Sequence, residues 1–232
     1  MFTYPKFDVE IVREVDPASL GWPEPGAAQD ETGLGCNRSY FDLRRLTWAE
    51  ARRTADLERQ LIQRIESAPD HEAEYEAIED ELFESDEGLH GLDLGIAGAV
   101  IALSAAGCVP FASCNAGSFG GRHHEAYPLV VFYARAEAVD GLLASAEEAE
   151  IGLGGGEWLT AYADDVRKMV RFAAALSARS RAFRAARTRR SARMREPEPD
   201  ADPDPAQYKL EFTVSDGAAD EPNFPLPLHS GR

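Results

Sequence analysis

The sequence predicts an α+β fold, a layered sandwich in which a small mixed sheet is covered by helices. Segments with helical periodicity follow segments patterned as strands in an irregular order. Residues 94–121 carry no charged side chain, which indicates a buried helix that runs into a buried strand. With 232 residues and 44% hydrophobic side chains, the chain is long and apolar enough to bury a core.

Residues 1–92 are expected to form one strand, one loop and two helices. The segment 7–15 nearly alternates apolar and polar side chains, as a half-buried strand does. A loop rich in proline and glycine follows this segment. We therefore expect an N-terminal strand that joins the sheet of the core, followed by a long connection to the first helix.

The first helix is predicted over about 48–67. Thr47 and Glu50 have the spacing of a capping box, in which each side chain accepts a hydrogen bond from the other's backbone amide. A second, strongly acidic helix is predicted over 71–85. The apolar faces of the two helices consist of Leu57, Leu61 and Ile65, and of Tyr75, Ile78 and Leu82.

Residues 93–190 are expected to form the core, in the order α-β-β-α-β-α. Asp93 can cap a helix over about 94–106, and Gly107 can end it in the left-handed conformation. This helix is apolar or small on nearly every side. We therefore expect it to be central and covered by other elements.

The rest of the core follows from shorter signals. A strand over 108–113 leads into a glycine-rich loop, and the continuous apolar run 129–133 indicates an interior strand. A helix at about 136–149, a strand at about 157–163 and a long helix from Asp164 complete the order.

Residues 1–190 are thus predicted to form a single domain. Residues 191–206 are rich in proline and charge, which favours a disordered linker. Residues 207–232 contain a possible edge strand and a tail. We find no internal repeat.

Charge and composition limit the function. The net charge of −17 repels phosphates, so this acidic protein is not expected to bind nucleic acid. Residues 70–87 carry ten acidic side chains and residues 166–195 carry eleven basic ones, which are expected to neutralise each other internally. Glycines and a proline interrupt the uncharged stretch, and the N-terminus lacks the pattern of a secretory signal. We therefore expect a cytoplasmic protein without a membrane span.

The candidate site lies in residues 113–125, where chemically capable side chains are concentrated. One hypothesis is nucleophilic catalysis, with Cys114 as thiolate and His123 or His124 as base. Glu125 or Asn115 would orient the imidazole. Against this, Cys114 follows a strand and does not start a helix, where thiolates are often activated.

A second hypothesis is zinc binding. Cys114 with His123 or His124 supplies two suitable ligands, because zinc prefers thiolate and imidazole. A complete site would need further ligands, such as Cys36, His71, His90 or a carboxylate. With three cysteines and no paired Cys-x-x-Cys, no ligand set is complete within the motif.

A third hypothesis is non-covalent recognition of a ligand or partner. Gly117, Gly120 and Gly121 allow close backbone approach, so that amides could face an anion while Arg122 and His123 supply charge. Ser113 and Asn115 are further ligand candidates. The fourth alternative is structural: Cys114 is then a small buried apolar residue, and the glycines shape a hairpin.

The motif Ser113-Cys114-Asn115-x-Gly117-x-x-Gly120-Gly121-x-His123-His124-Glu125-x-x-Pro128, preceded by a helix rich in glycine and alanine, resembles a group of uncharacterised bacterial proteins. The resemblance covers about residues 90–135. It implies a bacterial, cytoplasmic protein with a site at this motif, and it brings no activity, cofactor or substrate.

The leading functional prediction is recognition of a small polar ligand or partner through the 113–125 loop. The first alternative is a thiol- or zinc-dependent enzyme that uses Cys114 with His123 or His124. The second alternative is an interaction protein that works through its acidic and arginine-rich helices.

Overall fold

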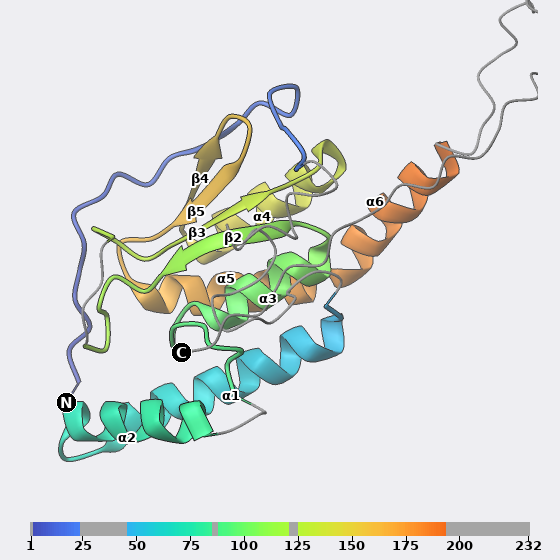
Figure 1. Cartoon of the computed structure of the whole chain (residues 1–232). Helices are drawn as coiled ribbons and strands as arrows, with labels where there is room; N and C mark the ends of the chain where they lie inside the picture. The colour runs from blue at the N-terminus through green and yellow to red at the C-terminus, as the bar shows by residue number, and fades with distance from the viewer. Residues whose placement is uncertain (1, 24–45, 85–87, 121–124, 194–232) are drawn as a thin grey trace, which may run out of the picture. The chain divides into compact units, whose positions relative to one another are not determined.

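The computed structural model describes residues 2–23, 46–84, 88–120 and 125–193. These residues form six α-helices and a five-stranded mixed sheet, which confirms the predicted α+β class (Figure 1). The elements are β1 (Arg13–Val15), α1 (Trp48–Ser67), α2 (His71–Glu84), α3 (Ala97–Ala106), β2 (Val109–Cys114), β3 (Leu129–Tyr133), the short 3-10 helix η2 (Ala136–Ala138), α4 (Val139–Ala149), β4 (Gly152–Gly155), β5 (Leu159–Tyr162), α5 (Val166–Ala178) and α6 (Ser180–Arg193).

The sheet has the strand order β1-β4-β5-β3-β2. Strand β1 is parallel to β4, and the other neighbours are antiparallel. Within the described residues the helices lie on one side of the sheet, and α1 packs on α3 and α5 while α2 packs on α1 (Figure 1). This arrangement gives the sheet an inner face covered by helices and an outer face on which none of the described helices lies.

Two clusters of buried apolar side chains hold these layers together. The main cluster lies between the inner face and helices α3, α4 and α5, and includes Val130 and Phe132 of β3. The second cluster lies between the N-terminal segment, α1 and α2, and includes Tyr4, Tyr75 and Phe119. Every residue of α3 is buried, because other elements cover it on all sides, as predicted for a central helix.

The sequence signals for the ends of α1 and α3 are confirmed in part. The capping box of α1 is present: the Thr47 amide donates to Glu50 Oε2 (2.6 Å), and the Glu50 amide donates to Thr47 Oγ1 (3.2 Å). Gly107 ends α3 in the left-handed conformation, with φ +94°. The predicted start of α3 is wrong, because the helix begins at Ala97, and Ile96, the residue before it, makes no capping side-chain hydrogen bond. Asp93 accepts a hydrogen bond from another part of the chain, as described below.

The N-terminal strand is shorter than the predicted 7–15. Arg13–Val15 forms the strand beside β4, and of the preceding residues Val12 also bonds to β4 while Phe7 bonds to another segment. The Phe7 amide donates to the carbonyl of Asp164 (2.9 Å), and the Val12 carbonyl accepts from Leu153 (2.9 Å). The alternating pattern therefore continues beyond the part of the segment that meets the sheet.

Strand β4 was not predicted, so the core order is α-β-β-α-β-β-α-α. Its sequence is Gly-Leu-Gly-Gly, which has no alternating side-chain pattern. The ring of Tyr162 lies over Gly152, and a Cβ atom there would collide with it. The glycine run therefore serves packing, which sequence periodicity does not report.

The predicted long helix from Asp164 is two helices. Asp165 caps α5, because its side chain accepts from the Arg167 amide (2.9 Å), and Arg179 separates α5 from α6. Most described side chains of α6 are exposed, while Phe183 and Ala186 are buried. The second half of the predicted helix is therefore more exposed than the first.

The ion pairs given below for the charged helices involve other neighbours than expected. Arg64 of α1 binds Glu74 and Glu81 of α2, at 2.8 and 2.7 Å. Arg179, at the end of α5, binds Glu148 of α4 (2.5 Å). No helix in the described ranges is long and apolar enough to cross a bilayer. The chain divides into Met1–Arg195 and Glu196–Arg232, and the predicted linker, edge strand and tail lie almost wholly outside the described residues.

Candidate functional site

Asn115 anchors the loop that follows β2, and its side chain is fully buried. The backbone amide of Asn115 donates to Asp93 Oδ2 (3.1 Å), and its side-chain Nδ2 donates to the carbonyl of Leu94 (3.0 Å). Because Asp93 and Leu94 come just before α3, Asn115 fastens the end of β2 to the start of that helix. This ligand candidate therefore uses its polar atoms to hold backbone.

Asn115 also closes a tight turn. Its Oδ1 accepts from the Gly117 amide (2.9 Å), and its carbonyl accepts from the amide (3.2 Å) and hydroxyl (2.5 Å) of Ser118. Ala116 and Gly117 are left-handed, with φ +55° and +70°. The Gly120 amide donates to the Gly117 carbonyl (3.1 Å). The amides of Gly117 and Gly120 are thus engaged within the protein, and an anion would compete with these bonds.

Ser113 and Cys114 point to opposite faces of the sheet. Ser113 pairs with Val130, which belongs to the main cluster, whereas Cys114 pairs with the next residue of β3, Leu129. Cys114 is 8% exposed, and its Sγ accepts a hydrogen bond from the Ala116 amide (3.3 Å). The thiol therefore belongs to the outer face, at the point where the loop begins.

The remaining candidates are placed only in part. Glu125 is exposed and precedes β3. Gly121, Arg122, His123, His124 and Cys36 lie outside the described residues. The convergence of the imidazoles on Cys114 therefore stays a prediction.

The zinc hypothesis gains no ligand set from the described part of the chain. No three His, Cys, Asp or Glu side chains within it are grouped so that they could hold a metal ion. His71 Nδ1 lies 2.6 Å from the carbonyl oxygen of Ile65, so one ring nitrogen is already engaged. Cys108 lies in the main cluster, and burial raises its pKa to about 12. A zinc site would thus need at least one ligand from outside the described residues, such as Cys36, His123 or His124.

The outer face carries aromatic side chains that the sequence analysis did not single out. Phe111, Tyr133 and Trp158 contact one another, with ring centroids 5.2–6.2 Å apart, and Trp158 is 45% exposed. Tyr127 and Tyr162 form a second pair at 5.6 Å. A cross-strand row of small side chains runs between the two groups and consists of Ala112, Val131, Thr160 and Gly154.

Phe119 ties the loop to the second cluster. It is buried and stacks on Phe2 of the N-terminal segment, with centroids 5.9 Å apart and planes at 8°. Tyr4 meets it edge-on at 5.9 Å, and Tyr75 of α2 stacks on it at 6.1 Å. Three rings from two distant segments thus enclose the side chain that follows the Asn115 turn.

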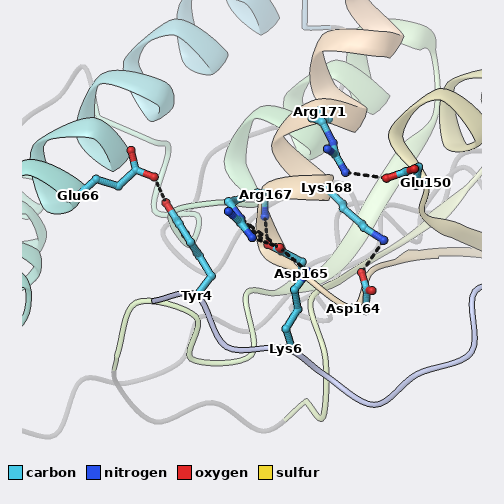
Figure 2. A network of polar contacts seen from close by, with 9 residues as sticks. All are labelled: Tyr4, Lys6, Glu66, Glu150, Asp164, Asp165, Arg167, Lys168 and Arg171. Atoms are coloured by element: carbon cyan, nitrogen blue, oxygen red, sulfur yellow. Dashed lines mark hydrogen bonds and ion pairs between the residues drawn. The ribbon is translucent and has the colours of Figure 1, made fainter. Parts of the chain in front are cut away.

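A polar network around Asp165 holds the N-terminal segment in place (Figure 2). Lys6 Nζ lies 2.8 Å from Asp165 Oδ2, and Arg167, which binds the same carboxylate, lies over the Tyr4 ring at 4.4 Å. The Tyr4 hydroxyl donates to Glu66 (2.8 Å). Burial alone would raise the pKa of Asp165, but the hydrogen bonds from Arg167 and Lys6 lower it to about 2. The carboxylate is therefore charged at neutral pH and keeps both cations.

Glu58 of α1 is a fully buried carboxyl group beside the start of α3, and sequence reasoning missed it. Its Oε1 accepts from the Gly95 amide (2.9 Å), and its Oε2 accepts from the Gly98 amide (3.2 Å). Burial raises the pKa of Glu58 to about 7, although these amides act in the opposite direction. Its spacing from the buried residues Thr54 and Leu61 is the available sequence signal, because it places Glu58 on the core side of α1.

Comparisons of the chain with models of protein families, with curated proteins and with solved structures give no match. The functional interpretation therefore rests on the geometry of the loop, the outer face and the groups that hold them.

Proposed function

We propose that the protein recognises a small polar ligand or a partner through the loop 113–125 and the adjoining outer face of the sheet. The placement of Cys114 carries this proposal. Its side chain shares a cross-strand row with Leu129 and Tyr162, so the loop begins beside the aromatic groups of the outer face. Loops on a rigid scaffold, next to aromatic side chains, are common recognition sites.

The fixed first half of the loop supports recognition. Asn115 and Phe119 hold residues 115–120 through backbone bonds and ring contacts. A backbone that is ordered before binding loses less conformational entropy when a ligand arrives. Because the Gly117 and Gly120 amides are engaged internally, we assign polar recognition to the side chains of residues 122–125.

A thiol-dependent enzyme is the second candidate, and one observation favours it. The Ala116 amide points at Cys114 Sγ (3.3 Å), and an N–H group in this position stabilises a thiolate. The candidate bases His123 and His124 follow in the same loop. Cys108 offers an internal contrast, because burial raises its pKa to about 12 and makes it unreactive.

The recognition proposal is tested by titrating the labelled full chain with a panel of small polar compounds and recording backbone amide shifts. We expect a compound that moves the amides of residues 113–125 together with those of Leu129 and Tyr162. The variant Cys114→Ser should weaken this response, and the matched variant Cys108→Ser should keep it. Compounds that bind only elsewhere on the chain would refute the proposal.

The enzyme candidate is tested by alkylation in a Cys36→Ser background. An activated Cys114 should react at neutral pH faster than a peptide thiol, whose pKa is about 8.5. Replacing His123 and His124 by alanine should then slow the reaction without unfolding the protein. Alkylation of Cys114 no faster than that of a peptide thiol would remove the enzyme candidate and leave ligand recognition.

A further inference from the structure

The start of α3 is capped from a different helix. The residue before it, Ile96, makes no capping side-chain hydrogen bond. The two oxygens of Glu58, on α1, accept from the Gly95 amide (2.9 Å) and the Gly98 amide (3.2 Å) instead. The first amides of a helix have no intrahelical partner, and a carboxylate at this position also meets the positive end of the helix dipole. Glu58 therefore takes the part that a local capping residue usually plays.

The segment that Glu58 holds also holds the candidate site. Leu94, whose carbonyl accepts from Asn115 Nδ2 (3.0 Å), is the direct neighbour of Gly95. Gly95 also packs under the loop, because a Cβ atom there would lie 3.0 Å from the Phe119 ring. Gly95 has a φ of +90°, in the left-handed region that favours glycine. The close approach to Phe119 is therefore possible only with this local backbone conformation. A shift of Gly95 would thus reach the loop in two ways. It would move Leu94, which Asn115 binds, and it would move the Phe119 ring.

Several charged and titratable groups on the surrounding elements are paired with other groups. Helix α3 contains none. On the elements packed against Glu58, the pairs are Arg59 with Asp56, Arg64 with Glu74 and Glu81, His71 with the Ile65 carbonyl, Tyr75 with Glu79, Asp93 with the Asn115 amide, Arg167 with Asp165, Lys168 with Asp164, and Arg171 with Glu150. The protonation of Glu58 is thus governed by its burial and by the amides at the start of α3.

We propose that Glu58 is a positioning residue whose deprotonation loosens the start of α3 and, through Asp93 and Leu94, the loop that begins at Cys114. The protonated carboxyl group is neutral, so it can stay buried while it accepts amide hydrogens. When it gives its proton to solvent, the buried charge loses the stabilisation that water would provide, and the amides of Gly95 and Gly98 replace only part of it. Conformations that open the start of α3 and hydrate the carboxylate are then favoured, and they close again when the carboxyl group takes a proton back from solvent.

The change falls near neutral pH, because burial raises the pKa of Glu58 to about 7. Its effect on ligand recognition rests on the proposed function of the loop, and it adds control of that loop by pH. The link between Glu58 and the loop backbone is independent of any ligand, so the two are tested separately.

The link is tested by nuclear magnetic resonance on the full chain, from about pH 5 to about pH 9. The side-chain carboxyl carbon of Glu58 should titrate with a midpoint near 7. The amides of Gly95, Gly98, Asn115 and Ser118 should shift with the same midpoint. Their hydrogen exchange, corrected for base catalysis, should be roughly tenfold faster in the deprotonated form, the factor that one pKa unit represents.

Two variants assign this titration. Glu58→Gln should abolish the common midpoint at Asn115 and Ser118. The matched variant Glu76→Gln, at an exposed glutamate of α2, should leave it unchanged. Histidine side chains in general titrate in this pH range, so the double variant His123→Asn and His124→Asn should also keep the midpoint at Gly95.

The wild-type carboxyl titration decides the matter even if Glu58→Gln does not fold. A Glu58 midpoint below about 5.5, near that of an ordinary glutamate, overturns the proposal. So does a titration of Asn115 that persists in Glu58→Gln. The function is judged separately, by the affinity of a loop-binding compound at about pH 6 and about pH 8.5. A compound that binds equally at both refutes pH control and leaves recognition intact, whereas a common titration without any loop-binding compound supports the link and refutes recognition.

Discussion

The two buried clusters of this molecule differ in chemistry and in what they hold. The main cluster, between the sheet and helices α3, α4 and α5, is built from aliphatic side chains with a few rings such as Phe132 and Phe172. The second cluster joins the rings of Tyr4, Tyr75 and Phe119, and the carboxyl group of Glu58 lies at its border with α3. The main cluster therefore stabilises the fold by burial alone. The second cluster positions the loop through groups that can change charge.

The largest expected effect separates the clusters by simple burial. Phe132→Ala removes a fully buried ring from the main cluster and should lower the free energy of unfolding by about 3–5 kcal/mol. Its neighbour Tyr133 points to the outer face, so Tyr133→Ala should cost about 1 kcal/mol or less. Urea denaturation measures both. Equal losses would mean that the two faces of β3 are not distinct in energy.

A pH effect on stability should be specific to the second cluster. The pKa of Glu58 is raised in the folded state, so its contribution to stability is fully present below about 4.5 and is lost as the pH rises through about 7. The shift from 4.5 to about 7 corresponds to about 3 kcal/mol at most. Denaturation at several pH values should show this decline in the wild type and in Phe132→Ala. If the decline in stability persists in Glu58→Gln, another titrating group causes it.

Substitutions at two glycines near the ends of α3 separate the effect of packing from that of backbone strain. Gly95 and Gly107 have similar left-handed backbones, with φ +90° and +94°. A Cβ atom at Gly95 would collide with Val166 and press on Phe119, whereas one at Gly107 would meet nothing within 4 Å. Gly107→Ala should therefore cost about 1 kcal/mol, and Gly95→Ala about 2–4 kcal/mol, as strain and overpacking add. Thermal denaturation measures the difference, and equal costs would show that the second cluster adapts.

The hydrogen bonds of Asn115 should matter more than those of the loop hydroxyl. Asn115→Ala leaves the Leu94 carbonyl and the Gly117 amide without their partner, and should cost about 2 kcal/mol. Ser118→Ala removes one hydroxyl bond and should cost about 1 kcal/mol. Faster amide exchange confined to residues 115–120 in Asn115→Ala would locate the effect. Exchange that accelerates equally across the sheet would contradict a local role.

The smallest effect is expected where the N-terminal segment meets α5. Lys6→Ala removes an ion pair whose lysine side chain is 60% exposed, so it should cost less than about 1 kcal/mol. High salt should reduce even this cost. A large, salt-independent loss would show that the segment contributes more to the second cluster than its exposed ion pair suggests.

Much of the fold could be predicted because it depends on local interactions. The Thr47 and Glu50 capping box joins residues three apart, and Gly107 ends its helix through its own backbone conformation. The interior strand 129–133 is a continuous apolar run, and its bounds agree with the structure. The predicted strand before the glycine-rich loop is present as β2, and it could be predicted because glycines and polar side chains follow an apolar segment.

The remaining features were decided by tertiary structure. Strand β4 contains glycine where the Tyr162 ring leaves no room for a side chain. Cys114 faces outward because of its register with Leu129. The spacing of Glu58 indicates that it faces the core. Its partners, the amides of Gly95 and Gly98, come from 37 and 40 residues away. Most helices and strands, and the sides of them that are buried, could be predicted from the amino-acid order, since those properties depend on neighbours along the chain. Only the packing of α1 on α3 decided what the buried carboxyl group binds, because hydrogen bonds between distant segments depend on three-dimensional contact.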